Sequence, residues 1–147
     1  MAADSTHTWT TDLVIPSQRG AGKQFLTDLL DHLHAYHWPE PDIFGIHLSV
    51  EEAVVNAIKH GNRLDPDKTV EIHCQLNAHR LWIKIIDQGC GFDPAAVPDC
   101  TADENLEVPS GRGILLMKSF MNRVEYSPTG NSVIMEKTRA MANHVSS

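Results

Sequence analysis

Apolar side chains recur every three or four residues in three parts of the chain, and this spacing predicts three helices. The first helix is expected over residues 17–37, with Ser17 as its N-cap. The second is expected over 43–60, with Asp42 as its N-cap, and a shorter third helix over 114–121. Each helix would have one apolar side to bury against another layer.

Apolar and polar residues alternate in five other segments, which is the pattern of half-buried β-strands. These segments are 7–15, 70–76, 81–86, 123–126 and 132–137. Strands and helices do not alternate strictly, so a doubly wound parallel sheet is disfavoured. The predicted fold is an α/β (α+β) two-layer sandwich, in which helices cover one face of a mostly antiparallel mixed sheet.

Length and composition narrow the class of protein. The 147 residues fit one domain, and 41% of them are hydrophobic, as in a globular protein. A net charge of −7 argues against direct binding of nucleic acid. The three cysteines lack CxxC spacing, which fits a reducing cytoplasm, and no apolar run is long enough to suggest a membrane span. We therefore expect a cytoplasmic protein.

One connection is too long to be an ordinary loop. Residues 88–113 are rich in glycine, proline and aspartate, and a connection of this length is typical of a functional lid or of disorder. The tail from about residue 139 is expected to be flexible.

A line of polar residues runs along the second predicted helix. Glu52, Asn56 and His60 are spaced four residues apart, on the side opposite the apolar residues, and Ser49 is expected on that side as well. This pattern can be an ordinary solvated face. It can also be chemical, because a carboxamide oxygen suits Mg²⁺ bound to triphosphate and a carboxylate can act as a general base. Of the tandem pair Glu51 and Glu52, only Glu52 lies four residues from Asn56.

Asp87 directly follows the predicted strand 81–86 and shares the parity of its apolar residues, so its carboxylate should point toward the core. A buried carboxylate needs a hydrogen-bond donor. The amino group of a purine would be one such donor, whereas in the alternative interpretation Asp87 caps the following turn. Position alone does not separate the two.

Glycines follow at two points where backbone approaches closely or turns sharply. Gly89 and Gly91 come just after Asp87, and Gly111-Arg112-Gly113 opens the third helix, whose first N–H groups can hold anionic oxygens. Neither segment is a Walker A sequence or a dinucleotide-binding fingerprint.

Taken in order, these stretches resemble the N, G1 and G2 boxes of the ATPase superfamily that contains gyrase, heat-shock chaperones, histidine kinases and mismatch-repair proteins. Segments 49–57 and 111–117 are most similar to the bacterial anti-sigma-factor serine/threonine kinases, and the similarity spans roughly residues 17–137. The resemblance implies a histidine-kinase-like ATPase fold and one ATP-binding kinase domain over residues 1–147.

The resemblance also implies a role for each motif residue. Glu52 would be the general base, Asn56 would hold Mg²⁺, and Asp87 would read the adenine amino group. Segment 93–110 would close over ATP as a lid. The other nucleotide-binding residues would be His60, Gly89, Gly91, Gly111, Arg112, Gly113 and Ser132. Ser132 would support Asp87 through its hydroxyl. For Arg112, an ordinary surface position without a ligand is an equal alternative.

The implied function is that of a magnesium-dependent transferase in transcription regulation. It would phosphorylate an anti-sigma antagonist, bind a sigma factor and form a homodimer, with no direct contact to nucleic acid or membrane. The alternative is a nucleotide-dependent regulatory binding module that transfers no phosphate. The catalytic part of a histidine kinase is a weaker third reading, because the sequence leaves no room for a helix pair carrying a phosphoacceptor histidine.

Overall fold

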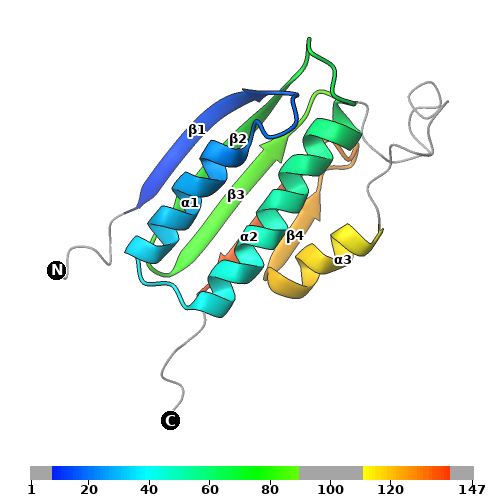
Figure 1. Cartoon of the computed structure of the whole chain (residues 1–147). Coiled ribbons are helices and arrows are strands. Elements are labelled where there is room, and N and C mark those ends of the chain that lie inside the picture. Colours follow the sequence, from blue (N-terminus) through cyan, green and yellow to red (C-terminus); the bar gives the residue numbers. More distant parts are fainter. Residues whose placement is uncertain (1–7, 90–110, 140–147) are drawn as a thin grey trace.

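The computed structural model of the chain describes residues 8–89 and 111–139, and for residues 111–114 it describes the backbone only. The expected lid at 93–110, Gly91 and the tail beyond residue 139 lie outside the described residues. Within them, helices cover one face of a five-stranded sheet (Figure 1). The elements in chain order are β1 (Trp9–Pro16), α1 (Lys23–Ala35), α2 (Glu40–Val55), the π-helix η2 (Asn56–Gly61), β2 (Thr69–Leu76), β3 (Arg80–Ile86), α3 (Gly111–Phe120), β4 (Arg123–Tyr126) and β5 (Ser132–Thr138).

The strand order across the sheet is β1-β2-β3-β5-β4, and all four pairings are antiparallel. The predicted two-layer sandwich is therefore confirmed, although the described strands include no parallel pair of the kind a mixed sheet would have. Because β5 pairs with β3 in the antiparallel direction, the end of β3 lies beside the beginning of β5. The candidate site lies at this edge of the sheet.

Every second side chain of the central strands is buried, because the pleat sends alternate residues toward the helices. In β2 and β3 these residues are Val70, Ile72, Cys74, Leu76, Leu81, Ile83 and Ile85. Leu29 and Leu33 of α1 and Ile46 and Val50 of α2 are fully buried from the helical side. Each large aliphatic side chain contributes about 1.5–3 kcal/mol when fully buried, so this layer holds the helices in place on the sheet.

Both predicted N-caps are wrong. Ser17 precedes α1 without capping it; its side chain is 2% exposed, and Oγ donates to the carbonyl of Lys68 at 2.8 Å. The second helix starts earlier than predicted, with Pro41 in its first turn, where the missing N–H of a proline costs nothing. Asp42 is therefore inside that turn, and its Oδ1 lies 3.9 Å from Nζ of Lys137.

Helix α2 lies between α1 and α3 on the sheet (Figure 1). Its contact with α3 is close at Gly45, where a Cβ would lie 2.7 Å from the ring of Phe120. Ser49, expected on a solvated face, is 0% exposed. That expectation is wrong because α2 has neighbours on both sides.

None of the helices in residues 8–89 and 111–139 is long and apolar enough to cross a membrane.

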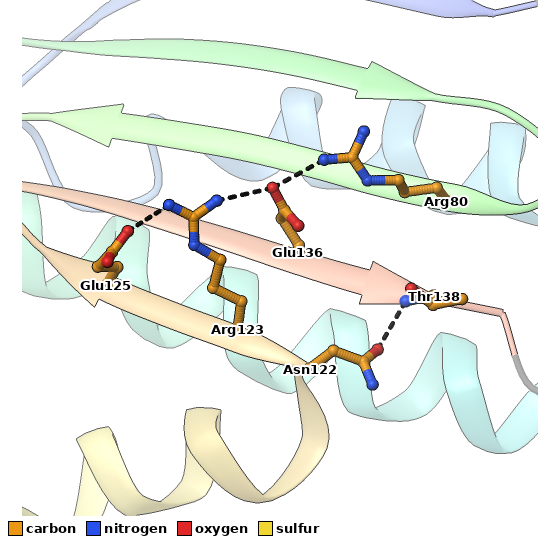
Figure 2. Close-up of polar contacts among 6 residues, drawn as sticks. All are labelled: Arg80, Asn122, Arg123, Glu125, Glu136 and Thr138. Atoms are coloured by element: carbon orange, nitrogen blue, oxygen red, sulfur yellow. Dashed lines mark hydrogen bonds and ion pairs between the residues drawn. The ribbon is translucent and has the colours of Figure 1, made fainter.

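The face of the sheet away from the helices carries a network of charged side chains (Figure 2). Oε2 of Glu136 accepts hydrogen bonds from Nη2 of Arg80 at 2.7 Å and from Nη1 of Arg123 at 2.9 Å. Arg123 also pairs with Glu125. Its hydrogen bonds raise the pKa of the guanidinium group, and the bond to Glu125 has a larger effect than the bond to Glu136. The network ties β3, β5 and β4 together on the side opposite the candidate site.

Candidate functional site

A cavity opens between the C-terminal end of α2 and the ends of β3, β4 and β5. Its empty volume is about 380 Å³, counting the space open to solvent. Four of the predicted site residues border it: Asn56, His60, Asp87 and Ser132. The other residues around it are Ala53, Ala57, Gly61, Ile85, Tyr126, Gly130 and Val133. Segments far apart in the sequence therefore meet around one hollow.

The helix changes form where the cavity begins. In η2 the backbone N–H of Asn62 donates to the carbonyl of Ala57 at 2.9 Å, five residues back instead of four. In an α-helix, Gly61 would be turned about 140° away from Asn56, because each residue advances about 100°. The wider π-turn brings both residues to the cavity, together with His60, whose Nδ1 is buried without a partner among the described residues.

Asn56 is only 7% exposed, so the interpretation of its position as part of a solvated face is wrong. Its Nδ2 is buried and has no full hydrogen bond among the described residues. The hydroxyl of Tyr126 nevertheless interacts with the Asn56 side chain. Burial is the main cause that raises the pKa of Tyr126 to about 12; the contact with Asn56 lowers it, and the charges of Glu52 and Asp87 raise it. Tyr126 therefore stays protonated at neutral pH.

Asp87 is 8% exposed and points toward the helices, as its parity in the strand predicts. Burial, which penalises the charged form, raises its pKa to about 6, against the lowering effects of the Gly89 N–H and of Lys68. Oδ1 accepts the Gly89 N–H at 2.8 Å, so the turn-capping interpretation is correct as far as this oxygen is concerned. Oδ2 has no donor among the described residues and remains available to a ligand.

Two glycines let the helix end and the strand end approach each other. A Cβ on Gly61 would lie 2.3 Å from Oδ2 of Asp87, and a Cβ on Gly89 would lie 1.9 Å from the carbonyl oxygen of Gly61. Both distances are far below van der Waals contact. A larger residue at position 61 would push the carboxylate of Asp87 out of its position, and one at position 89 would collide with the backbone of Gly61.

Asn62 joins the helix end to the turn that carries Asp87. It is 1% exposed, and its Oδ1 accepts the backbone N–H of Gln88 at 2.7 Å. Its Nδ2 donates to Oγ of Ser17 and to the carbonyl of Thr69, both at 2.8 Å. The sequence pattern gives no sign of this role for Asn62, because its partners come from three different segments of the chain.

The two adjacent glutamates face different surroundings. Glu52 is half-buried, and its charge contributes to the raised pKa of Tyr126, so it lies near the cavity. Glu51 is exposed, and its Oε1 lies 3.8 Å from Nε2 of His47. The geometry thus favours Glu52 as the glutamate that can act at the site.

The structure supports the roles of the other predicted site residues only in part. Ser132 borders the cavity, but within the described residues its hydroxyl makes no hydrogen bond to Asp87. The backbone N–H of Asp87 instead donates to the carbonyl of Asn131 at 2.8 Å, so support from Ser132 stays a prediction. Gly111 and Gly113 form the first turn of α3, where backbone N–H groups lack helical partners.

Comparison with known proteins places this geometry in a family. A family model for the histidine kinase-like ATPase domain matches residues 16–137. The chain belongs to the histidine kinase-like ATPase family. Membership in this ATPase family implies that the chain binds ATP.

Several relatives within the family carry the same name. The anti-sigma F factor of Clostridium beijerinckii is 34% identical over 102 residues, which cover 65% of this chain and 71% of the relative. That of Oceanobacillus iheyensis is 38% identical over 94 residues, covering 60% of this chain and 64% of the relative. These matches confirm the resemblance to the anti-sigma-factor branch that the three boxes indicated.

A solved structure shows the same fold. The RsbU and RsbW domains of a Mycobacterium tuberculosis protein match with a TM-score of 0.59 and 14% sequence identity, over 89% of this chain and 32% of that chain. The histidine-kinase-like fold expected from the sequence is confirmed.

The side chains at the cavity fit a magnesium nucleotide. Asn56 offers one neutral oxygen ligand, and Mg²⁺ commonly completes its octahedral shell with phosphate oxygens and water. Within residues 8–89 and 111–139 no group of three or more His, Cys, Asp or Glu residues lies close enough together to hold a metal ion. A cation shared between Asn56 and a triphosphate suits this set of donors.

Proposed function

We propose that the chain is an ATP-dependent serine/threonine protein kinase that phosphorylates an anti-sigma antagonist and also binds a sigma factor. One observation carries the proposal: Asp87, buried and with one oxygen that has no donor among the described residues, shares a cavity with Asn56, and Glu52 lies near it. These groups have the chemistry to bind adenine, hold a cation and accept a proton. The family membership and the names of the relatives give the reaction its context.

Adenine recognition depends on Asp87. Oδ2 accepts a hydrogen bond from the exocyclic amino group of the base, while Oδ1 remains bonded to the Gly89 N–H at 2.8 Å. A hydrogen bond to an ionised group contributes about 1.5–3 kcal/mol, and more where water is excluded. The glycines at 61 and 89 keep this carboxylate in place.

Phosphoryl transfer depends on Asn56 and Glu52. Oδ1 of Asn56 would hold a magnesium ion, which would supply neutralisation of the triphosphate charge. Glu52 accepts the proton of the substrate hydroxyl while the hydroxyl oxygen forms a bond to the γ-phosphorus. The bond between the γ-phosphorus and the β–γ bridging oxygen breaks, and ADP leaves.

The partners follow from the relatives named anti-sigma F factor. We infer that a sigma factor is held and that the antagonist, a second protein, is the phosphate acceptor on serine or threonine. Two copies of the chain would form the binding unit.

The test is a transfer assay with ATP labelled on its γ-phosphate and the antagonist of the same cell. The wild-type chain should label the partner on serine or threonine. Glu52→Gln should lower the transfer rate by about 10²–10⁴-fold, the usual contribution of a general base, and keep its ATP affinity. Glu51→Gln, one position away and directed toward His47, is the matched control and should retain the wild-type rate.

Other outcomes would change the assignment. ATP binding with no label on any partner would make the chain a nucleotide-dependent binding module. An acid-labile label would indicate phosphohistidine. If the wild-type chain failed to bind ATP at all, the proposed function would be wrong.

A further inference from the structure

Tyr126 is a polar residue of the cavity that none of the three sequence boxes contains. It ends β4, and its register opposite Val133 of β5 places it on the face that carries the helices. Its side chain borders the cavity together with Asn56 and Asp87. A phenylalanine would fill the same space, so the hydroxyl requires a separate explanation.

The proposed function requires one orientation of the Asn56 carboxamide, with its oxygen toward the cation. The oxygen and the nitrogen of a carboxamide occupy nearly the same shape, but only the oxygen can bind a cation. The enclosed atom in this structure is Nδ2, which is buried without a full hydrogen bond among the described residues. A nearby acceptor is needed to keep the amide in this orientation.

The Tyr126 hydroxyl has the required properties. It interacts with the Asn56 side chain and borders the same cavity. A neutral hydroxyl oxygen can accept from an N–H group without competing for the cation as a carboxylate would. Glu52 and Asp87 are close enough to influence the same hydroxyl. Without the tyrosine oxygen, these carboxylates would attract the NH₂ group of Asn56 and turn Oδ1 away from the nucleotide.

We propose that Tyr126 is a positioning residue for Asn56: its hydroxyl oxygen faces Nδ2 and thereby keeps Oδ1 directed toward the bound magnesium nucleotide. The inference rests on the proposed function, because it assumes that Asn56 holds the cation. It adds a residue of β4 to a site otherwise built from α2, η2 and the turn after β3.

The test separates magnesium dependence from nucleotide binding. Calorimetry measures ATP affinity in EDTA and across a magnesium titration for wild type, Tyr126→Phe and Tyr36→Phe. In EDTA, Tyr126→Phe should bind ATP within about twofold of wild type. The magnesium concentration that gives half of the full change in ATP affinity should rise about tenfold. This is the lower end of the usual effect when a group that orients a metal ligand is lost.

Tyr36→Phe is the matched control. Tyr36 is also partly buried, but it is the C-cap residue of α1 and does not border the cavity. It should show the wild-type magnesium dependence. In the Asn56→Ala background, Tyr126→Phe should add no further change, because its partner is gone.

Three results would overturn the inference and leave the proposed function standing. An unchanged magnesium dependence would show that the hydroxyl does not act on Asn56, and an equal loss of affinity in EDTA and in magnesium would make Tyr126 a simple wall of the pocket. An added effect in the Asn56→Ala background would mean that it acts through another group. Absence of ATP binding by wild type would instead overturn the proposed function, and this inference with it.

Discussion

The Asp87→Asn variant replaces the buried carboxyl group of the cavity with a neutral amide of nearly the same shape. Burial raises the pKa of Asp87 from 3.8 to about 6, so its ionised form destabilises the folded protein by about 3 kcal/mol at neutral pH. The amide keeps an oxygen for the Gly89 N–H, but its buried NH₂ group still costs about 1–3 kcal/mol. We expect a net gain of up to about 2 kcal/mol, which raises Tm by up to about 8 °C. ATP affinity should fall about ten- to hundredfold with the loss of the charged acceptor.

The pH dependence gives the sharper measurement. Because the pKa of Asp87 is higher in the folded state than in the unfolded state, the folded protein binds the proton more tightly between about pH 4 and 6. The stability difference between the variant and wild type, measured by urea unfolding, should therefore be largest near pH 7.5 and shrink toward pH 4.5. Asp31→Asn, on the exposed side of α1, should give no such trend. A variant less stable than wild type at pH 7.5, with a flat difference across pH, would refute the reasoning.

Two further predictions concern the packing around the site. Gly61→Ala should abolish ATP binding in calorimetry, because its Cβ would lie 2.3 Å from Oδ2 of Asp87, and a normal affinity would contradict this close approach. Asn62→Ala should lower the free energy of unfolding by about 2–4 kcal/mol in urea melts, since the Gln88 N–H loses its acceptor and Ser17 loses a donor. A loss below about 1 kcal/mol would mean that this buried network contributes little.

Most of the fold could be predicted from the spacing of apolar residues, because the sheet buries alternate side chains with high regularity. All five strands were found in this way. The helix starts were misplaced, since Ser17 and Asp42 are good caps by residue type but have other partners in the structure. Pro41 carried the better signal for α2, as a residue favoured in the first turn. The burial of Ser49 depends on the packing of α2 between α1 and α3, which the period of a single helix does not contain.

The site was predictable where one residue type dictates the chemistry and less so where distant segments meet. Asp87 was found because its parity in the strand placed a carboxylate on the apolar face. Tyr126 could have been found from the same rule, since it shares the inner face of β4 with Val124. Asn62 has no comparable signal, because the register of the sheet and the path of the chain bring its partners together.

The geometry of the site depends on the number of residues in the π-helix η2. A turn closed over five residues holds one more residue than an ordinary turn. If this stretch became regular α-helix at its present length, Gly61 would stand about 140° around the helix from Asn56 and would leave the carboxylate of Asp87. Asn62 would then leave its partners as well. Deleting one residue would instead leave Gly61 four positions from Asn56, about 40° around an α-helix, so a shortened segment would present the same two residues to the cavity.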